Sequence, residues 1–180
     1  MRGNHKAFRL LVSMAILISG ATTPAVGLPE TKLIRFEIQD QFDRPHTERE
    51  FNGRNVLFLC ADRKGSQYQG QWLTALRDSL ESRGHAESIT VVEVADLRGV
   101  PFFIKGSVKK KFPKESTAWV LMDWKGSLAK AYDLEKGKCN IVLFDRSGGL
   151  MHKAAVEDLE VPVIEIILDQ VEDVDRRKAQ

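Results

Sequence analysis

Cysteine is scarce in this sequence of 180 residues, which contains only Cys60 and Cys139. The two lie 79 positions apart, so the chain has no Cys-x-x-Cys motif of the kind that dithiol oxidoreductases use. Two cysteines and a few scattered histidines also lack the spacing of a zinc site, and we expect no metal and no cofactor. The pair is still enough for one disulfide, if the two Cα atoms approach within about 7 Å. Two free thiols packed in a core are the alternative.

Long apolar runs are missing too, except near the start of the chain. Residues 10–18 (LLVSMAILI) are almost wholly apolar, follow a basic segment and precede a stretch of small residues that ends in Ala25-Val26-Gly27. This order is typical of a secretory signal peptide, and the run is shorter than the ~20 residues that a membrane-spanning helix needs. We therefore expect cleavage of residues 1–27, which would leave residues 28–180 as a periplasmic protein with no membrane span. A buried N-terminal helix is the alternative, but it would not require this asymmetry of charge.

An excess of charge of either sign is absent once the predicted signal peptide is removed. The whole chain has 27 basic and 25 acidic residues, and three of the basic residues but none of the acidic ones lie in residues 1–27. The mature chain would therefore have 24 basic and 25 acidic residues, a net charge of −1. A protein so balanced has no general attraction for nucleic acid, so we expect no nucleic-acid partner.

The sequence after the predicted signal peptide alternates strand and helix patterns. Residues 33–40 show the apolar–polar alternation of a strand, whereas residues 55–61 (NVLFLCA) and 88–95 (SITVVEVA) are apolar runs typical of strands covered on both faces. Between these runs, residues 66–83 place apolar side chains on one face of an amphipathic helix, with Ser66 as its expected N-cap. Residues 98–112 have a weaker helical pattern, because a proline and a glycine interrupt it.

Two similar units follow. In each, a strand ends in an aspartate (Asp123, Asp145) and a glycine stands three positions later (Gly126, Gly148). We expect the aspartate side chain to hold the turn while the glycine adopts a positive φ. The second unit is predicted to be a β-hairpin, and a last amphipathic helix is expected over residues 161–177. This order of elements predicts an α/β domain with a mixed sheet and helices on both faces.

One segment resembles the redox region of the thioredoxin-like superfamily, which includes thioredoxins, TlpA-like proteins and peroxiredoxins. When residues 56–67 (VLFLCADRKGSQ) are aligned on the alanine that ends the strand, Lys64-Gly65-Ser66-Gln67 stands where those proteins have Cys-Gly-Pro-Cys. Residues 140–145 (NIVLFD) resemble the strand after the cis-proline of that fold, and Cys139 stands near the position of that proline. Within the superfamily, residues 94–134 and the hairpin over 141–153 resemble the YtfJ family of periplasmic proteins. The resemblance implies a thioredoxin-like sandwich over residues 28–180.

The departures from the superfamily pattern point away from catalysis. Lys64 and Gln67 cannot supply the low-pKa thiolate or the resolving thiol that thiol–disulfide exchange requires. We therefore expect an exported binding or accessory protein without catalytic residues. The alternative is a thiol–disulfide redox protein that uses Cys60 and Cys139.

The degenerate loop is also the best candidate for a binding site, because free amide groups at a helix start attract negative charge and the neighbouring basic side chains add to it. The candidate partners are an envelope protein, a peptide or a small anion, and the candidate binding residues are Arg63, Lys64, Gly65, Ser66, Gln67 and, on the opposite wall, Asn140. The alternative is a surface turn that has lost its former use. A separate run, residues 109–111 (KKK), suggests contact with an acidic lipid or polymer, although a solvated helix end is the simpler interpretation.

Overall fold

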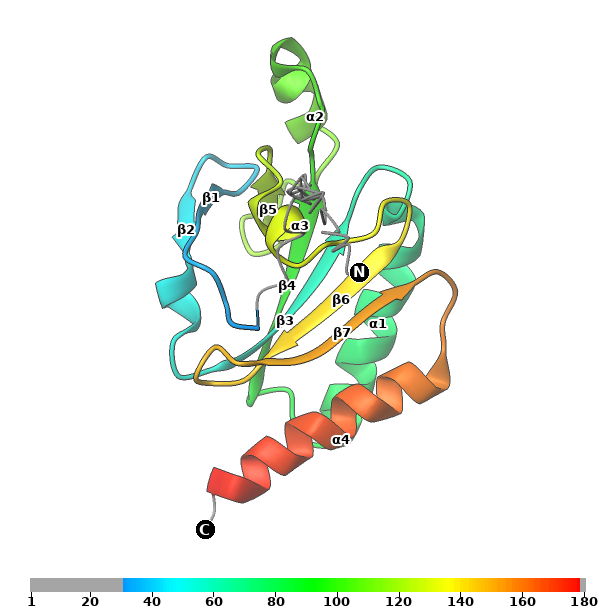
Figure 1. Cartoon of the computed structure of the whole chain (residues 1–180). Helices are drawn as coiled ribbons and strands as arrows, with labels where there is room; N and C mark the ends of the chain where they lie inside the picture. Colours follow the sequence, from blue (N-terminus) through cyan, green and yellow to red (C-terminus); the bar gives the residue numbers. More distant parts are fainter. Residues whose placement is uncertain (1–30, 179–180) are drawn as a thin grey trace, which may run out of the picture.

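The computed structural model describes residues 31–178, so the predicted signal peptide lies outside the described residues. A five-stranded sheet forms the centre of the domain, with the strand order β5–β4–β3–β6–β7 (Figure 1). The three strands β3, β4 and β5 are parallel, whereas β6 is antiparallel to β3 and β7 is antiparallel to β6. The bounds of these strands are β3 Asn55–Ala61, β4 Ile89–Asp96, β5 Val120–Asp123, β6 Cys139–Phe144 and β7 Leu150–Val156. The predicted mixed sheet is confirmed.

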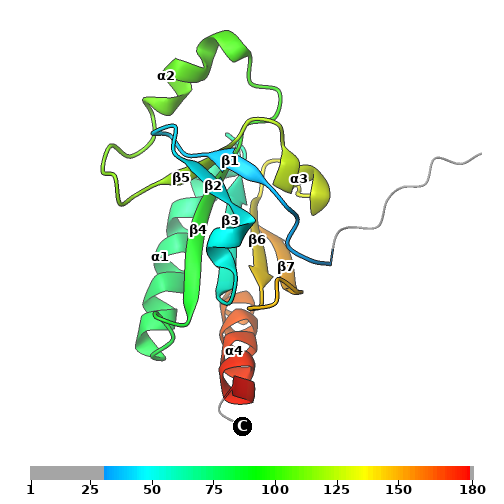
Figure 2. The same ribbon diagram turned by 90° about the vertical axis from the view of Figure 1, so that its left-hand side faces the viewer.

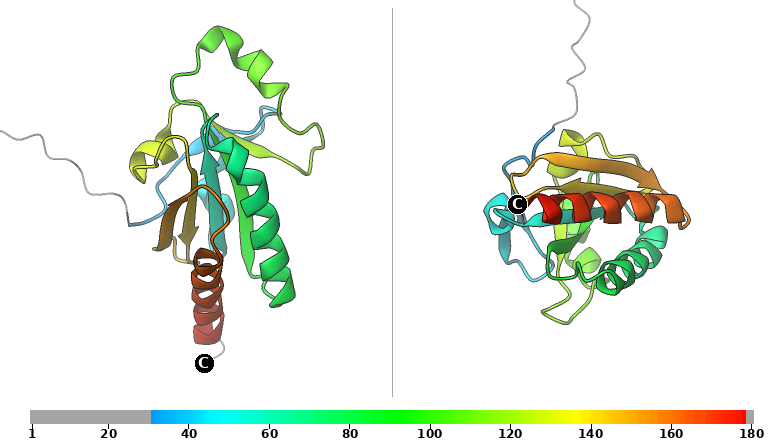
Figure 3. Two further views of the ribbon diagram at one scale, coloured as in Figure 1. Left: turned by 90° about the vertical axis from the view of Figure 1, so that its right-hand side faces the viewer. Right: turned by 90° about the horizontal axis from the view of Figure 1, so that it is seen from below.

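Two helices cover one face of the sheet. These are α1 (Ser66–Ser82) and α4 (Val161–Lys178), which lie side by side in the view from below in Figure 3. The apolar stripe predicted for α1 is buried here, and Leu57 and Leu59 of β3 point toward it. The residues of the stripe are Trp72, Leu76 and Leu80.

The other face is covered by shorter elements: α3 (Ser127–Ala131), the 3-10 helix η1 (Glu48–Phe51) and a separate two-stranded sheet of β1 (Glu37–Gln39) and β2 (Pro45–Thr47). Figure 2 shows β1 and β2 lying across β3 and β4. Phe58 of β3 is the centre of this half of the core, because the rings of three other phenylalanines pack against it. Helices therefore cover both faces, as the sequence predicted.

Three details differ from the sequence-based expectations. The strand expected over residues 33–40 is limited to β1, which pairs with β2 outside the main sheet. The predicted alternation is kept, because Phe36, just before β1, and Ile38 within it are both buried. The helix expected over residues 98–112 is only the 3-10 turn η2 (Phe102–Ile104) and the short α2 (Lys105–Lys109). Ser66 is the first residue of α1 and not its N-cap, which is Gly65.

The two aspartate–glycine turns are confirmed. Asp123 accepts hydrogen bonds from the N–H groups of Ser127 and Leu128, and Gly126 has a φ of 65°. Asp145 accepts hydrogen bonds from the N–H groups of Ser147 and Gly149, and Gly148 has a φ of 77°. The first turn leads into α3, and the second joins β6 to β7 as the predicted hairpin.

Candidate functional site

The degenerate loop lies at the end of β3, where the chain turns into α1. Asp62, which follows the last strand residue, organises this turn through its carboxylate. One oxygen, Oδ1, accepts hydrogen bonds from the N–H groups of Lys64 (3.0 Å) and Gly65 (2.7 Å), and Oδ2 accepts one from the N–H group of Gly137 (3.1 Å). The Asp62 carbonyl also accepts a hydrogen bond from the N–H group of Ser66 (2.9 Å). Three of the amide groups that were expected to attract an external anion, those of residues 64–66, are therefore already bonded within the chain.

The loop is closed against the segment before β6. A Cβ atom added to Gly65 would lie 2.0 Å from the Lys138 carbonyl oxygen, which shows how closely the two backbones approach. The methylene groups of Lys64 lie beside Gly137, where an added Cβ atom would meet Lys64 Cδ at 3.2 Å. The structure thus brings together the two walls predicted from the sequence, but it brings them into direct contact.

Asn140 supports this arrangement from inside. Its side chain is 2% exposed. Its Oδ1 accepts a hydrogen bond from the Glu135 N–H group (2.8 Å), while its Nδ2 donates to the Glu135 carbonyl (2.9 Å). Asn140 therefore fixes the loop of residues 135–138 and does not face a groove. Of the other candidates, Gly65 is buried, and Arg63, Lys64, Ser66 and Gln67 are exposed.

A carboxylate of the protein itself, that of Glu157, lies beside the start of α1. Lys138 Nζ lies 2.6 Å from Glu157 Oε1. Because of this hydrogen-bonded ion pair, the pKa of the Glu157 carboxyl is lowered and the pKa of the Lys138 ammonium is raised. The backbone carbonyl of Glu157, the residue after β7, also accepts a hydrogen bond from Trp72 Nε1 (2.9 Å), which joins the end of that strand to α1. Sequence reasoning missed Asp62 and Glu157, although an aspartate between a strand and a helix is a recognised turn signal.

Neither cysteine belongs to the helix start. Cys60 is 1% exposed and packs in the core half around Phe58, whereas Cys139 is fully buried in the half under α1 and α4. Both thiols are free, so the disulfide considered from the sequence is not formed, because the two side chains point to opposite faces of the sheet. Burial raises the pKa of the Cys60 thiol well above its ordinary value, and it raises the pKa of Cys139 to about 12.

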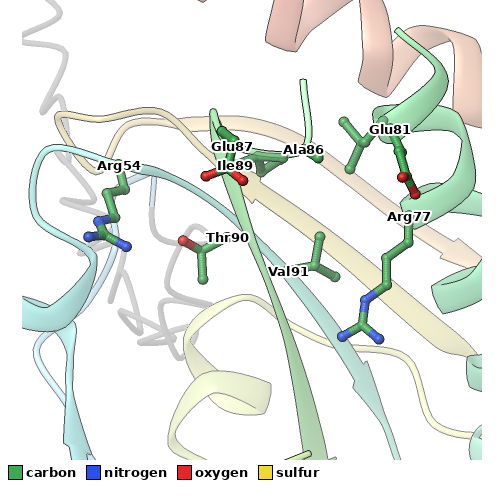
Figure 4. Close-up of a pocket in the computed structure, with 9 residues that line it drawn as sticks. Arg54, Arg77, Glu81, Ala86, Glu87, Ile89, Thr90 and Val91 are labelled. Atoms are coloured by element: carbon green, nitrogen blue, oxygen red, sulfur yellow. The ribbon is translucent and has the colours of Figure 1, made fainter. Parts of the chain in front are cut away.

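A pocket of about 490 Å³ lies at the other end of the sheet (Figure 4). Its walls come from the last turns of α1, including Arg77 and Glu81, and from the start of β4 at Ile89–Val91. Arg54 and Arg77 flank it on two sides in Figure 4. The pocket is therefore separated from the degenerate loop by the length of the strands.

Within residues 31–178 there is no group of three or more His, Cys, Asp or Glu side chains placed to hold a metal ion. In the same part of the chain, no helix is both long and apolar enough to cross a membrane.

Comparison with solved structures identifies the fold. The chain is similar to the exposed lipoprotein thioredoxin Etrx1 from Streptococcus pneumoniae, with 18% identity and a TM-score of 0.53 over 78% of this chain and 99% of that one. It is also similar to the thioredoxin domain of a thiol-disulfide oxidoreductase from Bacteroides vulgatus, with 16% identity and a TM-score of 0.53 over 80% and 98% of the two chains. A third similar structure is BsSco, a member of the Sco family of cytochrome c oxidase assembly proteins (13% identity, TM-score 0.56, 79% and 92% covered).

The described domain therefore has a thioredoxin-like fold, as the resemblance implied. The sequence itself matches no protein-family model, and no match is found among curated proteins. The more specific resemblance to the YtfJ family stays a prediction.

Proposed function

We propose that this chain is an exported thioredoxin-fold protein that binds or assists another molecule without thiol chemistry. The observation that carries the proposal is the position of the two thiols. Thiol–disulfide exchange requires an accessible thiolate, and in this fold the thiolate stands at the start of the helix that follows the central strand. Here that start is Lys64-Gly65-Ser66-Gln67, and both thiols lie in the core.

The protonation of the thiols supports the same conclusion. Burial disfavours the charged form of a thiol, and the pKa of Cys139 is raised to about 12. At neutral pH the thiolate fraction of such a group is negligible. The competing redox function would need Cys60 and Cys139 to form a bridge, which requires one of the two side chains to cross to the other face of the sheet.

Thiol titration tests this proposal. For the chain from Leu28 onward, Ellman's reagent should find almost no reactive thiol in the native protein and two thiols per chain in denaturant. A Lys64→Cys variant is the matched control, because its added thiol at the exposed helix start should react at once. Rapid reaction of Cys60 or Cys139 in the native protein would contradict the proposal, as would the absence of free thiols in denaturant without reductant.

Export is the second part of the proposal, and it rests on the basic segment, apolar run and small-residue stretch of residues 1–27. The cellular protein should begin at Leu28 and be released with the periplasmic fraction, which intact-mass measurement checks. A chain that keeps Met1 and stays in the cytoplasm would contradict export.

A further inference from the structure

The segment between β4 and β5 projects from the body of the domain. It leaves the sheet at Asp96, at the edge where β3 ends and α1 begins, because Ala61 and Ala95 are paired in the parallel β3–β4 register. Figures 1 and 2 show η2 and α2 standing beyond the ends of the strands. The domain therefore has one narrow, convex protrusion on this edge.

The protrusion buries some apolar side chains and exposes others. Val100, Val108 and Phe112 pack against the core cluster that includes Leu97 and Met122. In contrast, the adjacent Phe102 and Phe103 are 82% and 81% exposed, and Ile104 is 37% exposed. We call these three residues the apolar tip. Since the same segment anchors itself with other apolar residues, the apolar tip is not needed to hold it in place.

The charge of the protrusion is mostly positive. Residues 97–119, which join β4 to β5, contain six basic residues and one acidic residue, Glu115, although the predicted mature chain as a whole is nearly neutral. Some of these cations are used internally: Arg98 pairs with Asp96, Lys109 pairs with Asp43, and Lys105 Nζ lies 4.8 Å from the centre of the Trp124 ring. The other three are exposed and have no ion-pair partner among the described residues; they are Lys110, Lys111 and Lys114.

We propose that the apolar tip and its three unpaired lysines dock this protein onto the surface of an anionic lipid bilayer. Apolar and aromatic side chains next to a group of lysines are the combination that interfacial segments present to such a surface. The small number of residues favours a bilayer over a protein partner, since the apolar tip and the three lysines are six residues, whereas a standard protein interface takes about 20–30 residues from each side. A fluid bilayer closes around such a tip without a shape-matched pocket.

Docking through the apolar tip would also orient the domain. The protrusion and the start of α1 share one edge of the sheet, so the contact between Gly65 and Lys138 would face the bilayer, while α4 runs toward the opposite end of the molecule (Figure 1). This inference goes beyond the proposed function and does not depend on it, because the residues that carry it include neither thiol and none of the degenerate loop.

Vesicle co-sedimentation tests the inference. The chain from Leu28 onward keeps the whole described fold and lacks the apolar run of residues 10–18, which would itself bind lipid. It should sediment with vesicles of equal parts phosphatidylglycerol and phosphatidylcholine at low salt, and much less with phosphatidylcholine alone.

The substitutions Phe102→Ser/Phe103→Ser should lower the apparent affinity for the anionic vesicles by about tenfold or more, since two phenyl groups can no longer be buried in the bilayer. The variant Lys110→Gln/Lys111→Gln should lower it several-fold and weaken its salt dependence.

Two controls match these variants. Ile166→Ser removes another exposed apolar side chain, on α4, and Arg49→Gln/Arg54→Gln removes two cations at the opposite edge of the sheet. Both should bind the vesicles like the unmodified chain, and all variants should show the same thermal unfolding. The inference would be overturned if the chain did not bind anionic vesicles, or if the phenylalanine variant bound them equally well. Binding of polyglutamate with no binding of vesicles would overturn it in favour of an acidic polypeptide partner.

Discussion

Cys60 and Cys139 lie on neighbouring strands one register position apart, yet their side chains belong to opposite faces of the sheet. Cys139 is paired with Ala61, whereas Cys60 is paired with Asn140. Side chains alternate along a strand and paired residues point to the same face, so an offset of one position separates the two thiols. They pack as two separate buried core residues, with no bond between the thiols.

The burial of Cys139 gives a prediction about stability at high pH. Its pKa in the folded protein is about 12, above the ordinary value of 9.0. Below pH 9 both folded and unfolded chains hold the proton, so the stabilisation is fully present. Between pH 9 and 12 only the unfolded chain releases it, and the free energy of unfolding should fall by up to about 1.4 kcal/mol per pH unit from this thiol.

Other groups also titrate in this range, so the prediction concerns a difference. Urea unfolding of the unmodified chain and of Cys139→Ala, measured between pH 7 and pH 10.5, should show a smaller loss of stability above pH 9 in the variant. Equal slopes in the two proteins would contradict the burial of this thiol.

The close approach of Gly65 to Lys138 predicts opposite effects for two glycines of one segment. Gly65→Ala would place Cβ 2.0 Å from a backbone oxygen, so the two loops must separate. We expect a loss of at least about 2 kcal/mol in the free energy of unfolding. Gly70→Ala is the matched control, because an added Cβ meets nothing within 4 Å and alanine favours a helix, which should stabilise α1 by about 0.5–1 kcal/mol. Equal effects of the two substitutions, measured by urea unfolding, would contradict the described packing.

Asp62 provides a third prediction. Asp62→Ala removes the acceptor for the N–H groups of Lys64, Gly65 and Gly137, and should lower the free energy of unfolding by about 1–2 kcal/mol. Asp78→Ala, at an exposed position of α1, should change the free energy of unfolding by less than about 0.5 kcal/mol.

The substitution Asp62→Ala also tests whether the Asp62 carboxylate takes the place that an external anion would have on the amides of residues 64 and 65. The unmodified chain should show no amide shift of residues 64 and 65 when titrated with phosphate, whereas Asp62→Ala should show one, because it frees those amides. Saturable shifts in the unmodified chain would mean that the loop accepts an external anion as it stands.

The sequence predicts those parts of the fold that depend on local patterns. The uninterrupted apolar run of β3, the stripe of α1 and the aspartate–glycine turns each specify their element without distant partners. The protrusion is different, because Val108 and Phe112 find their contacts in β4 and β5, and a proline and a glycine leave only a short helix between them. Periodicity alone cannot show which apolar residues of that segment remain exposed.

The site was predictable in position but not in chemistry. Alignment on the end of β3 correctly placed the loop at the helix start and opposite the segment before β6. The separation of the thiols depends on the register between β3 and β6, two strands that are distant in the sequence. A shift of this register by one residue would place both thiols on the same face of the sheet. The turn held by the Asp62 carboxylate was readable in principle, but its contact with Gly137 exists only in the folded chain.

The most direct test of the central claim is the rate of insulin disulfide reduction in the presence of dithiothreitol. Three proteins are compared: the chain from Leu28 onward, the variant Cys60→Ala/Cys139→Ala, and the variant Lys64→Cys/Gln67→Cys, which restores a thiol pair at the helix start. We predict that the first two have the same rate as dithiothreitol alone and that only the third is faster. A rate for the unmodified chain that is close to that of a thioredoxin, and that is lost in Cys60→Ala/Cys139→Ala, would contradict the account.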